Sequence, residues 1–254
     1  MSWAARRRFI ILLIVGAVFV AFLTIVGIAT FYQAPSCTDG VQNQEEEGID
    51  CGGSCSHLCT AQQQPPTVLF TKAIPNGVGR VDVIASVENK NANAAAKNVP
   101  YSITLYGSDQ TLIQQISGVF DLPARATEPI YVSGIQSGNR KVVGAFLDIA
   151  SSSPEWFTMM ADSRIVPTVS NTSLGGSTSA PRVTATLINP SVAILRDVQA
   201  IVIVRNEQGD VIAASKTVVP AIPAQGQATA TFTWNDTFSG TPVSIEVVPL
   251  IALP

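Results

Sequence analysis

The segment VDVIASVE, residues 81–88, decides the fold class of the chain. Every second residue from Val81 to Val87 is apolar, and most of the residues between them are polar. Successive side chains of a β-strand point to opposite faces, so this period of two predicts a strand with one face on a core. The segment YSITLY, residues 101–106, alternates in the same way, and the turn-forming run NKNAN at 89–93 lies between the two.

This pattern occurs twice along the chain. Five blocks recur with an offset of 99 or 100 residues: 85–89 with 185–189, 99–106 with 198–205, 112–113 with 211–212, 123–124 with 223–224, and 146–149 with 245–248. A constant offset indicates two copies of one module. Short strands separated by turns are typical of an immunoglobulin- or fibronectin-like β-sandwich. We therefore expect a mainly β fold with two tandem sandwiches, at residues 66–161 and 162–254.

Two segments of the second module depart from simple alternation. Residues 200–204, AIVIV, are apolar on both faces. This composition suits a central strand or a strand that the neighbouring module partly covers. Residues 170–179, SNTSLGGSTS, are rich in serine, threonine and glycine, so we expect a mobile loop that opens the second module.

Four aromatic residues near the ends of the modules have two interpretations. They pack in a core or between the modules, or they form a platform for a ligand. The four are Trp156, Phe157, Trp234 and Phe238. Two segments, Asn-Thr-Ser at 171–173 and Asn-Asp-Thr at 235–237, also fit the N-glycosylation sequon, a pattern that is common by chance.

The N-terminal part of the chain contains a candidate membrane anchor. Residues 9–32 carry no charge and would form a helix of about 36 Å, enough for a hydrocarbon core of about 30 Å. Three arginines, Arg6 to Arg8, precede this run. The positive-inside rule therefore predicts a cytoplasmic tail at 1–8, a signal-anchor helix at 9–32 in contact with membrane lipid, and an extracytoplasmic remainder. The alternative is a cleaved or lipidated signal, although the run is longer than the about 7–15 residues usual for one.

All four cysteines fall between residues 37 and 59, in a module with its linker at 33–65: Cys37, Cys51, Cys55 and Cys59. An even number of clustered cysteines outside the cytoplasm predicts two disulfides, with three pairings open. So short a segment has no room for a core, so cross-links would replace it. A zinc site made by Cys51, Cys55, Cys59 and His57 is the alternative.

The same module holds five acidic residues and no lysine or arginine. Calcium binds six to eight oxygen ligands, and Asp39, Asn43, Glu47 and Asp50 are the candidate ligands. Their spacing lacks the alternation and central glycine of an EF-hand loop. A solvated acidic loop is the alternative interpretation. Calcium is therefore the cofactor that the acidic residues suggest, beside the alternative zinc site of the cysteines.

The module resembles a pattern, C-x-D-G-x-x-N-x-x-E-x-x-x-D-C-G-G-x-C-x-x-C, of secreted and membrane-anchored surface proteins of bacteria and archaea. The matching residues are Cys37, Asp39, Gly40, Asn43, Glu46, Asp50, Cys51, Gly52, Gly53 and Cys55; Cys59 comes one residue later than in the pattern. Residues 87–89 and 99–106 also resemble FxLYD-type and late-embryogenesis-abundant (water-stress) β-sandwich repeats. The second module keeps Asn189 but has Arg205 in place of Tyr106. These resemblances imply a surface protein with β-sandwiches and no particular activity.

Composition excludes several functions. The net charge is −3 and no basic cluster lies beyond the N-terminus, which excludes nucleic-acid binding. Catalysis by a Ser-His-Asp triad is not expected, because His57 is the only histidine. Five acidic residues of the first module are scattered, and we expect them on solvated faces rather than paired in one cleft. They are Asp82, Glu88, Asp109, Asp121 and Asp148.

The sequence therefore predicts a non-enzymatic, membrane-anchored extracytoplasmic protein. It would be a structural or binding module of the cell envelope, with another envelope protein or a glycan as its partner. An accessory subunit of a membrane complex, such as a secretion or pilus-like assembly, is the first alternative. An enzyme of unknown class is the second.

Overall fold

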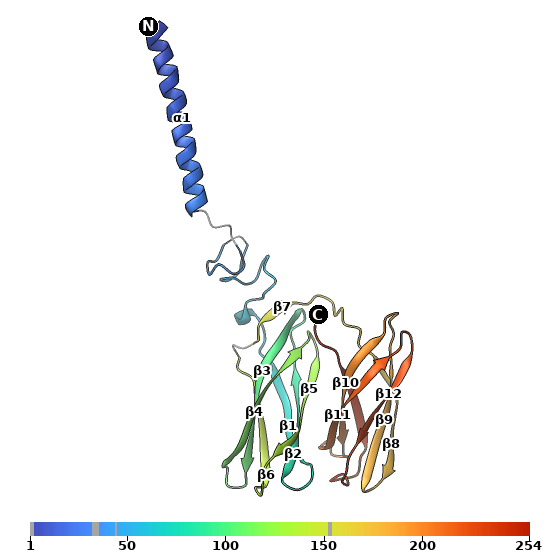
Figure 1. The fold of residues 1–254 in the computed structure, drawn as a ribbon. Coiled ribbons are helices and arrows are strands. Elements are labelled where there is room, and N and C mark those ends of the chain that lie inside the picture. Colours follow the sequence, from blue (N-terminus) through green and yellow to red (C-terminus); the bar gives the residue numbers. More distant parts are fainter. Residues whose placement is uncertain (1–2, 32–35, 44, 152–153) are drawn as a thin grey trace. The chain divides into compact units, whose positions relative to one another are not determined.

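The computed structural model describes residues 3–31, 36–43, 45–151 and 154–254 (Figure 1). The chain divides into two compact units, Met1–Cys55 and Ser56–Pro254. The fold is mainly β, with one apolar helix at the N-terminus and several antiparallel sheets that form β-sandwiches. The fold class predicted from the sequence is confirmed.

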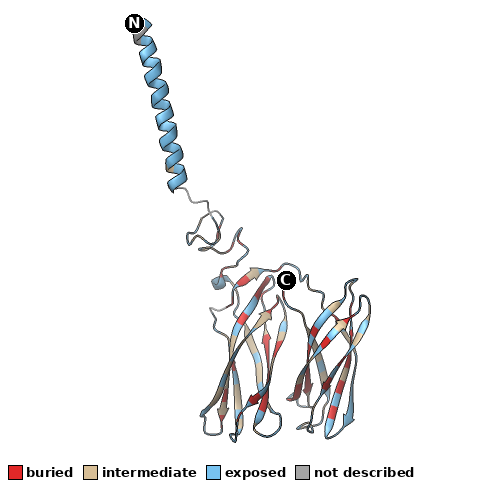
Figure 2. Cartoon of the chain, viewed as in Figure 1, coloured by how far each residue is buried: buried red, intermediate tan, exposed pale blue. Residues whose placement is uncertain are grey.

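The first unit begins with helix α1, Trp3–Phe31. Its segment Arg6–Thr30, 25 residues, is long and apolar enough to cross a membrane, and within the described ranges no other helix is. The hydroxyls of Thr24 and Thr30 donate to helix carbonyls one turn earlier, so these polar groups are satisfied within the helix. Figure 2 shows the helix exposed along its length. Protein contacts therefore do not cover its apolar surface.

Strands β1 to β7 of the second unit form the first sandwich. One sheet has the order β1-β2-β5 and the other the order β4-β3-β6, with β7 paired to the start of β3. The strands are β1 (Thr67–Pro75), β2 (Arg80–Glu88), β3 (Ala94–Gly107), β4 (Leu112–Leu122), β5 (Thr127–Gln136), β6 (Val142–Asp148) and β7 (Trp156–Thr158). A short 3-10 helix, Thr60–Gln62, precedes them. Backbone N–H groups of Leu58 and Thr158 donate across residues 56–58 and β7, so this part of the predicted 33–65 module joins the second unit.

The core of the first sandwich follows the period of two. Val81, Val83, Ala85 and Val87 on β2 are all buried in one cluster. Trp156 on β7 joins them and is 1% exposed, so its predicted packing in a core is confirmed. Burial of these apolar side chains is the main stabilising term for such a sandwich.

Strands β8 to β13 form the second sandwich, with sheets β12-β9-β8 and β11-β10-β13. The order is that of the first sandwich with seven added to each label. The strands are β8 (Thr168–Ser177), β9 (Ala180–Ile188), β10 (Leu195–Arg205), β11 (Val211–Ile222), β12 (Gln227–Thr233) and β13 (Ser244–Leu250). Val183, Leu187 and Phe232 lie in its core.

The prediction of a mobile loop at 170–179 is wrong, because most of this segment is strand β8, which pairs with β9. Its serines and threonines occupy an exposed edge strand, where polar side chains are tolerated. Gly176 has φ +83° beside the β8–β9 turn, and a Cβ there would lie 2.4 Å from the carbonyl oxygen of Ala180. The glycines that suggested a loop therefore form a tight hairpin.

The two sandwiches share an apolar joint. The buried residues of the joint are Ile84, Ile201, Ile203, Val211 and Ala214, with Phe70, Ile74, Tyr131 and Leu250 partly buried against them. Ala200, Val202 and Val204 of the same strand face the core of the second sandwich. Strand β10 is therefore both central in its sheet and covered by the first sandwich, as its apolar faces predicted.

Strand β2 is also buried on both faces, which corrects the prediction that its second face is solvated. Asp82 is only 5% exposed. Its carboxylate accepts from the Tyr131 hydroxyl at 2.6 Å, the Gly134 N–H at 2.7 Å and the Asn76 side-chain amide at 2.9 Å. These donors replace water around the charge, and without them its burial would be costly. Burial and the adjacent Asp82 raise the pKa of Tyr131, which keeps its proton for this bond.

A buried asparagine closes one end of the first sandwich. The amide group of Asn89, 1% exposed, donates to the carbonyl oxygens of Ala94 and Pro123, each at 2.8 Å. Its carbonyl oxygen accepts from the backbone N–H of Asn91 at 3.0 Å. One side chain thereby joins the β2–β3 connection to the turn between β4 and β5.

Asn189 has the same role in the second sandwich and is fully buried. It donates to the carbonyl oxygens of Ala193 at 2.7 Å and Pro223 at 3.0 Å. It accepts from the backbone N–H of Ser191 at 3.0 Å. The sequence match of Asn89 with Asn189 thus corresponds to matching hydrogen-bond networks.

Candidate functional site

The cysteines of the acidic module are oxidised. Cys37 and Cys55 form a disulfide with an S–S distance of 2.00 Å and a Cα–Cα distance of 5.7 Å. Cys51 and Cys59 are disulfide-bonded as well, and none of the four is a free thiol. The predicted oxidation is therefore present. Zinc needs deprotonated thiols as ligands, so the alternative zinc site has no thiolates to use.

The Cys-Gly-Gly sequence is required by the backbone of the module. Gly52 and Gly53 have φ values of +75° and +57°. A Cβ on Gly53 would lie 1.7 Å from the carbonyl oxygen of Glu45, and one on Gly52 would lie 2.7 Å from Cβ of Glu47. Only glycine therefore allows the chain to fold back against the acidic run and bring Cys55 to Cys37.

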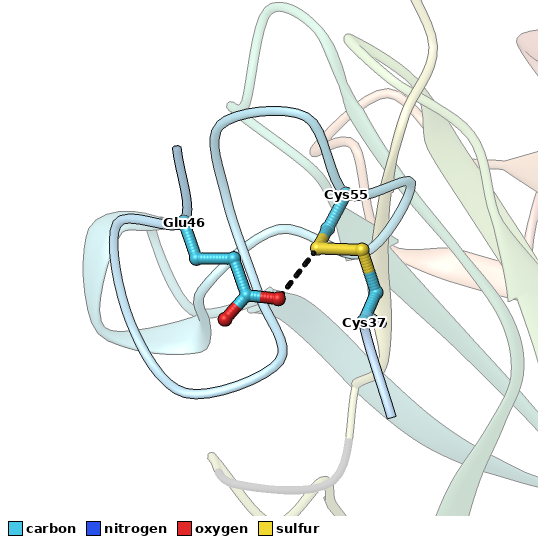
Figure 3. A group of neighbouring side chains, drawn as sticks. All are labelled: Cys37, Glu46 and Cys55. Atoms are coloured by element: carbon cyan, nitrogen blue, oxygen red, sulfur yellow. Dashed lines mark hydrogen bonds between the residues drawn. A yellow bond between two sulfur atoms is a disulfide. The ribbon is translucent and has the colours of Figure 1, made fainter. Parts of the chain in front are cut away.

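Glu46 is the buried acid of the module, 8% exposed. Its Oε2 accepts from the backbone N–H groups of Asn43 and Asp50, both at 3.3 Å. Its Oε1 lies 3.2 Å from Sγ of Cys55 (Figure 3). Cys37, Glu46 and Cys55 are the one group of three possible metal ligands found close together in the described part of the chain. Because both sulfurs are in the disulfide, this group lacks thiolates for a metal, and Glu46 serves to hold the turn.

The candidate calcium ligands are brought together in part. Oδ2 of Asp39 accepts from the Asn43 amide at 2.8 Å, and the Asp39 N–H donates to Oδ1 of Asp50 at 2.9 Å. Bonds from the Ser36 backbone, the Asn43 side chain and the Val41 backbone lower the pKa of Asp39. Oδ1 of Asn43 is buried and has no hydrogen-bond partner among the described residues.

The carboxylates of Asp39, Glu47 and Asp50 do not form a group of close ligand atoms in the described residues. Asp39 and Asp50 instead accept backbone hydrogen bonds within the module. Calcium binding by Asp39, Asn43, Glu47 and Asp50 stays a prediction.

A second cluster of charges links the two sandwiches. Arg164 belongs to the segment that connects β7 to β8, and its side chain is almost buried, at 9% exposed. It donates to Asp162 at 2.8 Å and to the carbonyl oxygen of Ile251 at 2.8 Å. It also pairs with Glu128 of β5 at 3.7 Å. One arginine therefore contacts the connecting segment, the first sandwich and the end of the second.

Within this charge cluster, the pKa of Glu128 is unusual. Burial raises its pKa to about 7, although the Arg164 charge acts in the opposite direction. The nearby carboxylates of Asp121 and Asp162 add to the upward shift. The buried carboxyl group of Glu128 therefore has a pKa close to neutral pH. A shifted pKa of this kind occurs at many functional sites, but structural ion-pair networks produce it as well.

The residues after β13 return to the first sandwich. The Leu253 N–H donates to Oδ2 of Asp121 at 2.8 Å. The Leu253 side chain is 5% exposed and packs in a cluster with Ala95 and Met159. A cavity of about 330 Å³ lies beside these contacts, and Glu128, Arg164 and Lys216 are among its lining residues. Hydrogen bonds, an ion pair and apolar packing thus connect both sandwiches here.

Sequence reasoning missed these residues. Asp121 was expected on a solvated face, but it is half-buried and accepts the bond from Leu253. Arg164, Glu128 and Leu253 carry no motif that separates them from ordinary surface or core residues. The alternating spacing that reveals a core face does not reveal which charges meet when two domains pack.

Comparisons with known proteins give little further information. No family model matches the chain, and no curated protein matches it. Among solved structures, red sea bream transglutaminase matches with 11% identity and a TM-score of 0.24, covering 76% of this chain and 32% of that one. A β-glucuronidase from glycoside hydrolase family 2 matches with 10% identity and a TM-score of 0.20, covering 87% and 29%. The chain spans about a third of the length of these enzymes, and similarities this low support no inference about its function.

Proposed function

We propose that this chain is a non-enzymatic protein, anchored in a membrane by α1, that presents its two sandwiches outside the cytoplasm as a binding or structural module of the cell envelope. The observation that carries the proposal is the succession of an exposed apolar helix and a fully oxidised cysteine module. Disulfides persist in oxidising compartments, and Arg6 to Arg8 before the helix favour a cytoplasmic N-terminus. The two features agree on which side of the membrane the sandwiches lie.

The repeat supports a binding or structural role. We infer that the two sandwiches are copies of one module, because their strand order is the same and Asn89 and Asn189 make equivalent bonds. Modules of this type provide stable strands whose connecting loops are free to vary, and such loops commonly carry binding residues. The single histidine, His57, is exposed and pairs through its backbone with Phe157.

Site-directed labelling tests the orientation. Because the four native cysteines are disulfide-bonded, an added cysteine is the one free thiol of the chain. We expect Thr178→Cys, in the exposed β8–β9 turn, to react with a membrane-impermeant maleimide in intact cells or spheroplasts. The matched variant Ser2→Cys, before the helix, should react only after the membrane is permeabilised. The opposite pattern would overturn the proposal.

The same preparation separates the alternatives. The mass of the purified protein should correspond to the 254 residues of the sequence, and a lower mass would indicate a cleaved signal. A partner retained through the helix after mild detergent extraction would favour the accessory subunit of a membrane complex. Hydrolytic turnover by the purified chain would favour an enzyme.

A further inference from the structure

A cleft opens between the two sandwiches, at the ends of their strands. It has a volume of about 380 Å³, which is within the usual range of about 300–1,000 Å³ for small-molecule sites. The hairpin between β1 and β2 forms one side, and the start of β11 together with the loop after β12 forms the other. Domain junctions are a preferred place for such sites. We call this feature the hairpin cleft.

Two aromatic rings line the hairpin cleft. Trp234 and Phe238 meet edge to face, with ring centroids 5.0 Å apart and planes at 84°. The indole N–H of Trp234 donates to the carbonyl oxygen of Ala214 at 3.1 Å, which fixes the orientation of the ring. Both residues pack only partly against the core of the second sandwich. The sequence left two roles open for these rings, packing and ligand contact. Both fit here, since packing holds the rings at a cleft where a ligand could contact them.

Polar groups at the cleft remain free to bind. Asn235, Asp236 and Thr237 line it and are exposed, and their side chains make no hydrogen bond in the described part of the chain. The deeper carboxylate, Asp82, is different because donors from Asn76, Tyr131 and Gly134 already surround it. The available hydrogen-bonding groups are thus one carboxylate, one carboxamide and one hydroxyl beside the aromatic pair.

The charge of the cleft limits the class of ligand. Asp82 and Asp236 line it, and no lysine or arginine does. An anionic ligand would meet these two carboxylates, and the guanidinium of Arg80 lies beside Gly77 rather than among the lining residues. A cation would use only the exposed Asp236 carboxylate, and exposed ion pairs contribute little. A neutral polyhydroxyl ligand would use the carboxylate, carboxamide and hydroxyl together, and its C–H face would lie against an aromatic ring.

We propose that the hairpin cleft binds a neutral saccharide, with Trp234 and Phe238 against the sugar ring and Asn235, Asp236 and Thr237 on its hydroxyl groups. This inference deepens the proposed function, because it rests on a binding role and names the class of ligand. A sugar unit of an envelope glycan would meet the cleft outside the membrane. Binding is measured on the purified protein, however, so its failure leaves the orientation measured in cells unaffected.

The test uses the full chain in a non-glycosidic detergent, because alkyl maltosides and glucosides would compete for the site. Cellobiose, maltose and diacetylchitobiose serve as probes, with saturation-transfer NMR to detect contact and tryptophan fluorescence to measure affinity. We expect at least one of them to bind saturably. Asp236→Ala should weaken that binding at least tenfold, whereas Asp148→Ala, an exposed carboxylate on β6, should leave it unchanged.

A second variant guards against misfolding. Trp234→Phe keeps an aromatic ring but shortens the stacking surface, and circular dichroism checks that the fold is retained. We expect weaker binding in a saturation-transfer NMR titration, which does not need the Trp234 signal, with an unchanged circular dichroism spectrum. Absence of binding by all three sugars, binding that Asp236→Ala leaves unchanged, or preferential binding of choline would each overturn the proposal.

Discussion

Asn89→Ala should destabilise the first sandwich by about 3–5 kcal/mol, because several buried groups lose their partners and each costs about 1–3 kcal/mol. The carbonyl oxygens of Ala94 and Pro123 lose a donor, and Asn91 loses its acceptor. Water does not easily replace the amide, since Asn89 is 1% exposed. Urea unfolding of the full chain in detergent, followed by tryptophan fluorescence and circular dichroism, measures the loss.

Two further variants make the result specific. Asn189→Ala should cause a similar loss in the second sandwich, because its side chain makes the equivalent bonds. Asn139→Ala, at an exposed turn position, should change the stability by no more than about 0.5 kcal/mol. If Asn89→Ala were as mild as Asn139→Ala, the asparagine network would not be a major support of the fold.

The free energy of unfolding should fall as pH rises from about 4.5 to about 7, because Glu128 loses its proton over this range. Burial raises the pKa of this carboxyl to about 7 in the folded chain from an ordinary value of 4.5, so the folded state binds the proton more tightly than the unfolded state does. The contribution is therefore greatest below pH 4.5 and is lost by about pH 7. Its size is about 3 kcal/mol, since one pKa unit corresponds to about 1.4 kcal/mol.

Glu128→Gln isolates this effect, because glutamine resembles the protonated form at every pH. The stability difference between the variant and the natural chain should grow from near zero at pH 4.5 to about 3 kcal/mol in favour of the variant at pH 8. Glu246→Gln, which removes an exposed ion pair with Arg205, should change stability by less than about 1 kcal/mol. A Glu128→Gln difference that does not vary between pH 5 and 8 would contradict the assigned pKa.

Much of the fold is predictable from the sequence, because strand periodicity is local. The alternation from Val81 to Val87 identifies the core face of β2, and the apolar pattern at 200–204 indicates that both faces of β10 are covered. The aligned positions of the two modules refine this point. Ile201 and Ile203 face the other sandwich, whereas the matching residues Ser102 and Thr104 lie outside that joint.

The remaining features depend on contacts between segments that are distant in the sequence. Asp82 interrupts an apolar strand and looks solvated, yet it is buried because Tyr131 and Gly134 from β5 supply donors. Arg164 and Glu128 are 36 positions apart in a sequence that gives no sign of their pairing. Segment 170–179 was misjudged since its composition is that of a loop, while its backbone pairs with β9.

The oxidation state of the four native cysteines in living cells tests the central claim most directly, and it requires no change to the protein. Intact cells are treated with N-ethylmaleimide, which enters all compartments, and the purified chain is weighed before and after reduction and a second alkylation. A chain that faces an oxidising exterior carries no added group before reduction and four after it, because all four cysteines are disulfide-bonded. Four groups added before reduction would mean that the module is reduced in the cell, and would contradict an extracytoplasmic location.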